Sequence, residues 1–78
     1  QLQQTRCGPH DKMTDLLGKR YIQKRTGYGV IQQHFIIEVY VSDRGSWTIL
    51  RTDRLGNTCI MATGHSWQSV APSPGESV

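Results

Sequence analysis

A chain of 78 residues forms one small domain, and folding buries only about 60% of the surface that the unfolded form exposes. Its formal net charge of +3 favours anionic surfaces but does not require nucleic acid as a partner. No apolar run approaches the roughly 20 residues that a membrane-spanning helix needs, so we expect no membrane span.

The two cysteines, Cys7 and Cys59, offer a means of reinforcing so small a core. A disulfide between them would close a loop of about fifty residues and stabilise the domain by about 4 kcal/mol. Disulfides persist in oxidising compartments, so a bonded pair indicates an exported protein, whether periplasmic, secreted or virion-associated. Two buried thiols in a reduced intracellular protein are the alternative. The chain begins with Gln1, which fits a mature exported protein or a shortened chain, and we expect export.

The first expected element is an amphipathic helix over residues 10–25. Its apolar side chains recur at helical spacing and comprise Met13, Leu16, Leu17 and Tyr21. Pro9 stands near the start, where a missing N–H does no harm. Gly27 and Gly29 are interpreted as the helix stop and a following turn.

Three strands are expected next, over residues 33–42, 47–52 and 58–63, because apolar and polar residues alternate there. The intervening segments SDRGS and DRLGN are typical of turns, and adjacent strands with short turns form an antiparallel meander. The segment 68–78 is rich in Ser, Pro and Gly and is interpreted as a tail. The predicted fold is therefore α+β, a single domain over residues 1–67 whose N-terminal helix packs on a three-stranded antiparallel meander.

The two faces of this meander depend on the register of its turns. Two-residue turns centred on residues 44–45 and 55–56 place one apolar set under the helix: Ile37, Val39, Leu50, Cys59 and Met61. The opposite side then carries the predicted partner face, which consists of Tyr40, Trp47, Ile49 and Ile60. We favour this register because it pairs Glu38 with Arg51 and puts Cys59 near Cys7. A three-residue turn with a bulge would instead group Trp47 and Ile49 with Val39 and Val41.

No metal, cofactor or catalytic group is expected. The histidines His10, His34 and His65 are too far apart in sequence to form the close ligand pairs of structural zinc sites. The carboxylates are scattered among helix, strand, turns and tail, and nothing marks Cys59 as an activated nucleophile. Only a pocket that brings His34 or His65 next to a carboxylate would favour a small hydrolase, so we predict that the protein is not an enzyme.

The strongest charged signal is the segment GKRYIQKR, residues 18–25. It supplies the predicted anion-binding set Lys19, Arg20, Lys24 and Arg25. These side chains suit the phosphates of a nucleic acid or another anionic surface, with an affinity that falls steeply as salt rises. A solvated outer helix face is the simpler interpretation of the same residues.

Three segments resemble a group of small exported proteins of marine and other alphaproteobacteria and their phages. They are CGPHDKMTDLLGKRY from Cys7, EVYVSDRGSWTILRT from Glu38 and GNTCIMATGHSW from Gly56. In that group a CGP motif, an amphipathic helix, a G-T/S-W-T-I strand and a second cysteine followed by A-x-G recur. The resemblance implies export and a disulfide between Cys7 and Cys59, and it implies no activity.

Together these observations predict a non-enzymatic binding or structural module, bacterial or phage, in an envelope or virion setting. Its partner is expected to be another protein, or a second copy of the chain, on the apolar partner face. Binding of nucleic acid or an anionic surface through the basic helix is the alternative.

Overall fold

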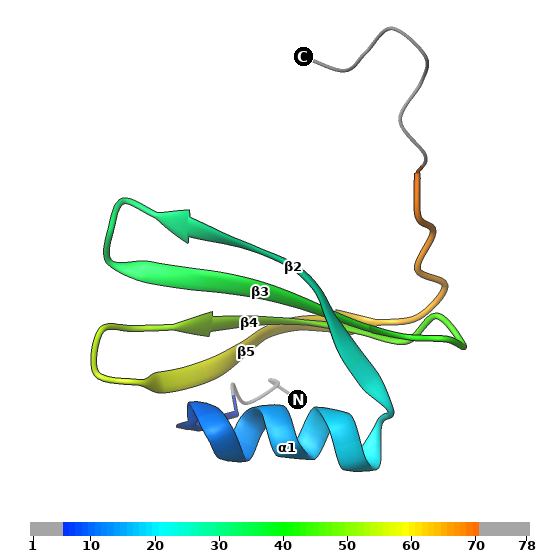
Figure 1. Cartoon of the computed structure of the whole chain (residues 1–78), viewed down its shortest axis with the longest axis horizontal. Helices are drawn as coiled ribbons and strands as arrows, with labels where there is room; N and C mark the ends of the chain where they lie inside the picture. The colour runs from blue at the N-terminus through cyan, green and yellow to red at the C-terminus, as the bar shows by residue number, and fades with distance from the viewer. Residues whose placement is uncertain (1–5, 71–78) are drawn as a thin grey trace, which may run out of the picture.

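Residues 6–70 are described by a computed structural model, in which one antiparallel sheet carries a helix on one side (Figure 1). The elements follow in the order β1 (Cys7–Pro9), α1 (His10–Arg20), β2 (Gln23–Ile31), β3 (Phe35–Ser42), β4 (Trp47–Thr52) and β5 (Asn57–Gly64). The strand order across the sheet is β1-β5-β4-β3-β2. The helix, the antiparallel sheet and the disulfide confirm the predicted fold in part. Within residues 6–70 the sheet has five strands and not three, so the described chain is mostly β.

The helix is shorter than the sequence predicts. It ends at Arg20, and Ile22 then adopts a left-handed backbone with φ 54°, a conformation that β-branched residues rarely take. A glycine usually marks such a helix end. Since Ile22 stands here instead, the sequence contains no recognisable signal for the end of the helix. Gln23 starts β2 directly afterwards, opposite Ser42 of β3.

The segment that was expected to end the helix is instead an edge strand. Gly27 and Gly29, interpreted from the sequence as a stop and a turn, lie within β2 opposite Val39 and Ile37. The pairing shifts by one residue at Thr26, where β2 carries a bulge. The bulge and the two glycines interrupt the alternation that identifies a strand, so tertiary pairing decides the structure here.

β1 is the opposite edge of the sheet and is tied to β5. Cys7 and Cys59 lie directly opposite each other and form the disulfide, as predicted. The backbone N–H of Ile60 donates to the carbonyl of Arg6 at 2.8 Å, so the pairing extends one residue before β1. A strand of three residues is too short to show a period, which is why it escaped prediction.

Both turns of the β3–β4–β5 meander use three-residue loops. Gly45 and Gly56 occupy the third position of their loops with φ of 96° and 89°, and each N–H donates back, to Ser42 and Asp53 respectively. Glycine accepts this left-handed conformation without a steric penalty. The favoured two-residue turns are therefore wrong, and the alternative register is confirmed.

That register sets the two faces of the sheet. Leu50 is 0% exposed and forms the core with Met13, Leu17 and Tyr40, while Ile60 packs against this cluster. Cys59, predicted to lie under the helix, is instead opposite Arg51 on the other side, together with Ile37 and Val39. A second bulge lies in β5 at Met61, opposite the step from Ile49 to Leu50 in β4. Met61, also predicted to be inside, is 50% exposed.

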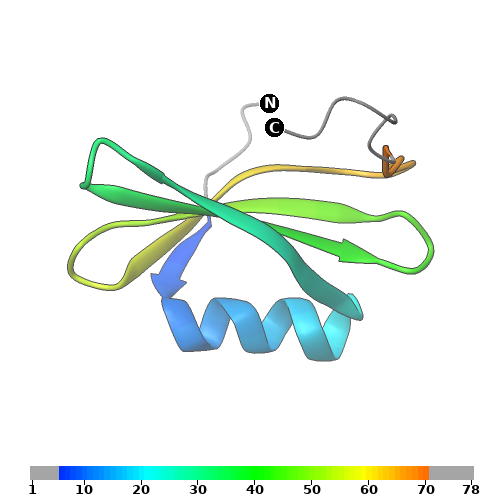
Figure 2. The same cartoon turned by 45° about the horizontal axis from the view of Figure 1, so that its top comes forward.

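Two views show how the layers lie (Figures 1 and 2). The helix α1 runs along one side of the sheet. The β2–β3 and β4–β5 turns extend beyond the N-terminal end of this helix. Of the expected tail, residues 68–70 form neither helix nor strand, and residues 71–78 lie outside the described residues.

Candidate functional site

The four residues of the predicted partner face do not share a surface. Tyr40 is only 7% exposed and belongs to the core, and Ile60 packs against that core under the helix. Trp47 and Ile49 lie on the other side of the sheet. The prediction of one face is wrong because it depended on the two-residue turns.

The side of the sheet opposite α1 carries a continuous apolar surface, which we call the open sheet face. Its central residues come from two neighbouring strands and are Ile37, Val39, Val41, Trp47 and Ile49. All five side chains are partly exposed. Among the described residues, no helix covers this side (Figure 2). Contiguous apolar surfaces of this kind often mark interaction sites.

One end of the open sheet face is closed by two tryptophans. The Trp47 indole N–H donates to the carbonyl of His65 at 3.1 Å, and the ring lies over Gly64, where an added Cβ would come within 2.7 Å of it. The Trp67 ring lies beside it with ring centroids 6.1 Å apart, and the Trp67 backbone N–H donates to the carbonyl of Gly45 at 2.9 Å. These contacts position Trp67 at this end of the open sheet face.

Next to the central residues, β2 contributes no side chains to the open sheet face at two positions. Gly27 and Gly29 pair with Val39 and Ile37 and contribute no side chains, and a Cβ added at either glycine would meet nothing within 4 Å. The side chains of β3 and β4 therefore form a ridge, and β2 forms a low edge of the face next to it.

A second feature, on the helix side of the sheet, is a buried carboxylate. Glu38 is 3% exposed and accepts three hydrogen bonds from three elements. His10 Nε2 lies 2.7 Å from Oε1, while Arg25 Nη1 and the Tyr40 hydroxyl each donate to Oε2 at 3.2 Å. Sequence reasoning missed this cluster because its members are far apart in the chain and Glu38 was expected to pair with Arg51.

The neighbours of Glu38 determine its protonation. Burial raises the pKa of the Glu38 carboxyl, but the hydrogen bonds from His10 and Arg25, the charge of His10 and the Tyr40 hydrogen bond outweigh burial, so the pKa lies below its ordinary value of 4.5. Burial and the neighbouring Glu38 charge raise the pKa of Tyr40 to about 12. Glu38 is thus an ionised acceptor, and the cluster joins α1, β2 and β3.

This cluster makes stability depend on pH with a defined sign. Because the folded pKa of Glu38 lies below 4.5, its contribution is complete above that pH and is lost as the pH falls through the lower, folded value. We expect urea unfolding between about pH 6 and about pH 3 to show a smaller loss of unfolding free energy for Glu38→Gln than for the native chain. Parallel curves for the two proteins would contradict this assignment.

The predicted anion-binding residues are dispersed by the early end of the helix. Lys19 pairs with Asp15 at 3.8 Å on the exposed helix surface, next to Arg20. Lys24 and Arg25 are consecutive in β2, so their side chains lie on opposite faces of the sheet, and Arg25 is bound to Glu38. The four cations therefore do not line one surface.

The histidines also occupy separate places. Among the carboxylates of residues 6–70, Glu38 is hydrogen-bonded to His10, and none is hydrogen-bonded to His34 or His65. His34 and Asp53 line one shallow hollow, but both carboxylate hydrogen bonds found for Asp53 come from the backbone N–H groups of its own turn. Within residues 6–70, no group of three or more His, Cys, Asp or Glu side chains is placed to hold a metal ion.

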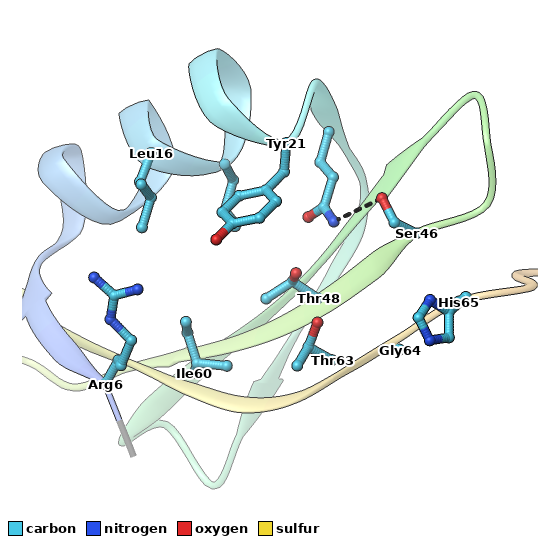
Figure 3. Close-up of a pocket in the computed structure, with 11 residues that line it drawn as sticks. Arg6, Leu16, Tyr21, Ser46, Thr48, Ile60, Thr63, Gly64 and His65 are labelled. Atoms are coloured by element: carbon cyan, nitrogen blue, oxygen red, sulfur yellow. Dashed lines mark hydrogen bonds between the residues drawn. The ribbon is translucent and has the colours of Figure 1, made fainter. Parts of the chain in front are cut away.

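A pocket of about 470 Å³ lies between α1 and the helix side of the sheet (Figure 3). Leu16 and Tyr21 line it from the helix and its end, and Ile60, Thr48 and Thr63 line it from β4 and β5. The remaining lining residues are Arg6, Leu17, Gln23, Ser46, Gly64 and His65. Apolar walls with a few polar groups are typical of small-molecule sites.

No protein family, curated protein or solved structure matches this chain. No helix within residues 6–70 has the length and the apolar character required to span a bilayer.

Proposed function

We propose that this protein is a small, exported, non-enzymatic binding module that associates with a second copy of itself through the open sheet face. The observation that carries the proposal is the apolar ridge formed by Ile37, Val39, Val41, Trp47 and Ile49, which no helix covers within residues 6–70. The disulfide between Cys7 and Cys59 supports export, because such bonds persist in oxidising compartments.

The shape of the open sheet face favours a second copy as the partner. A two-fold interface brings the same surface patch of both subunits together, so the patch must be complementary to itself. The ridge of Val39 and Ile49 beside the low edge at Gly27 and Gly29 meets this condition, because each ridge can pack over the other copy's β2. Sheets that pack face to face interdigitate their side chains in this manner.

The charges near the face determine how salt affects the association. Lys24 opposes Val41 and Arg51 opposes Ile37, so both cations lie on the open side of the sheet. The strand residues on this side include no acidic side chain. Two joined copies bring these cations closer together, and salt screens their repulsion. Association is therefore expected to strengthen as salt rises.

Sedimentation equilibrium of the native chain tests the proposal. We expect a monomer–dimer equilibrium in the micromolar to millimolar range, as suits a small interface. Val39→Lys places a further cation at the centre of the ridge, beside Lys24 and Arg51. We expect it to raise the dissociation constant about tenfold or more, because it adds to their repulsion and would be buried without a partner.

Leu55→Lys is the matched control, because it adds the same charge at a turn residue that is 87% exposed. It should leave the dissociation constant unchanged. A chain that stays monomeric throughout the concentration range, or equal effects of the two substitutions, would refute self-association. Binding to DNA, RNA or anionic lipid that weakens with salt would instead support the basic-residue alternative.

A further inference from the structure

We propose that the pocket between α1 and the sheet binds a small carboxylate with an apolar body and a hydrogen-bond donor at the end remote from the carboxylate. This pocket lies on the helix side of the sheet, whereas the open sheet face lies on the other side. The two proposals are therefore independent and can fail separately.

The size and walls of the pocket suit a compact apolar body. Its volume of about 470 Å³ lies within the range of about 300 to 1,000 Å³ that is usual for ligand pockets. Leu16 and Tyr21 face Ile60 across the space between helix and sheet (Figure 3). A single ring or a short aliphatic chain would contact both walls.

The need for a donor comes from Gln23, which is only 5% exposed. Its Nε2 donates to Ser46 Oγ at 3.1 Å, and the Ser46 hydroxyl is itself hydrogen-bonded to Ser42 at 2.7 Å. These bonds orient the amide, so its oxygen has a defined direction. Gln23 Oε1 is buried without a hydrogen-bond partner among the described residues. A buried acceptor without a donor is unfavourable, so a ligand that donates there is favoured.

The preference for a carboxylate comes from Arg6. Its guanidinium lies near Leu16 and Ile60, at the far end of the pocket from Ser46 (Figure 3). The lining residues include no Asp or Glu, so no acidic side chain of the pocket neutralises this cation. A guanidinium binds a carboxylate through two parallel N–H donors. The donor site at Gln23 and the cation at Arg6 thus define the two ends of the ligand.

The test uses the full chain and three related probes, with binding measured from backbone amide chemical shifts. Para-hydroxyhydrocinnamate has a ring, a carboxylate and a remote hydroxyl, hydrocinnamate lacks the hydroxyl, and para-ethylphenol lacks the carboxylate. We expect the first probe to bind at least about fivefold more tightly than either of the others. The largest shifts should occur at Ser46, Thr48 and Ile60, which line the pocket.

Two substitutions separate the two ends of the ligand. Gln23→Met removes the acceptor and should weaken para-hydroxyhydrocinnamate about fivefold while leaving hydrocinnamate unchanged. Arg6→Gln should weaken both carboxylates about tenfold while leaving para-ethylphenol unchanged. Gln68→Met and Arg54→Gln make the same chemical changes at exposed residues outside the pocket and should alter none of the affinities.

Several outcomes would overturn the proposal. Equal affinity for the three probes would show nonspecific apolar contact, and shifts confined to the open sheet face would place binding elsewhere. An unchanged affinity of para-hydroxyhydrocinnamate in Gln23→Met would mean that Gln23 Oε1 accepts no hydrogen bond from this probe. If Gln23→Met fails to fold, the probe series on the native chain and the Arg6→Gln variant still decide the matter.

Discussion

Removing the disulfide is expected to lower the free energy of unfolding by about 4 kcal/mol. Cys7 and Cys59 are 52 residues apart in the sequence, and a bond that closes a loop of this length restricts the unfolded chain by about that amount. A domain of this size has a net stability of only about 5 to 15 kcal/mol. The measurement is urea unfolding of the native chain and of the double variant Cys7→Ala, Cys59→Ala.

Reduction provides the control for this experiment. The native chain treated with reductant should approach the stability of the double variant, whereas the double variant should not respond to reductant. A loss below about 1 kcal/mol would contradict the role assigned to the bond. Intact mass with and without reductant and alkylation then shows whether the chain isolated from its source carries the disulfide, which bears on the proposed export.

Truncating the centre of the core should have the next largest effect. Leu50 is 0% exposed and packs with Met13, Leu17 and Tyr40. Leu50→Ala is expected to lower the free energy of unfolding by about 3 kcal/mol, because it removes buried apolar contacts and leaves a cavity. Thermal or urea unfolding measures the change.

Leu55→Ala is the matched control, since it makes the same truncation at a side chain that is 87% exposed. Its effect should stay within about 0.5 kcal/mol. Comparable losses at Leu50 and Leu55 would mean that the small core cluster is not the centre of stability. The pair therefore tests the placement of α1 on the sheet.

The two proposed binding sites lie on opposite sides of the same sheet. The side under α1 carries the core, the Glu38 cluster and the pocket, and its polar residues hold the helix and β2 in place. The open sheet face carries apolar side chains that no helix covers within residues 6–70. A sheet with one covered side leaves its second side available for another molecule.

Local patterns predicted several elements well. Burial on one face produces the alternation along β3 and β4 and the helical spacing of Met13 and Leu17. Such periodicity can be identified from the sequence of each element alone. The cysteine pair was also predictable, because a small domain with two cysteines gains most by joining them. Leu50 was placed correctly under the helix in spite of the wrong register.

The candidate sites were much less predictable. His10, Arg25 and Glu38 come from three elements and meet only after β2 pairs with β3. The pocket likewise depends on Gln23, in a strand that no pattern indicated. Sites of this kind are formed by contacts between distant residues, and spacing along one sequence contains no signal for them.

By itself, the sequence determined the start of the helix, the strands of the meander, the core positions Met13, Leu17 and Leu50, and the disulfide pair. These features depend on local periodicity, turn residues and loop-closure entropy. The tertiary structure alone decided the edge strands β1 and β2 and the register of the sheet. It did so because strand pairing joins segments that are distant in the sequence. The left-handed backbone of Gly45 and Gly56 forms three-residue loops, and a shift of one residue in the pairing exchanges the two faces of the sheet.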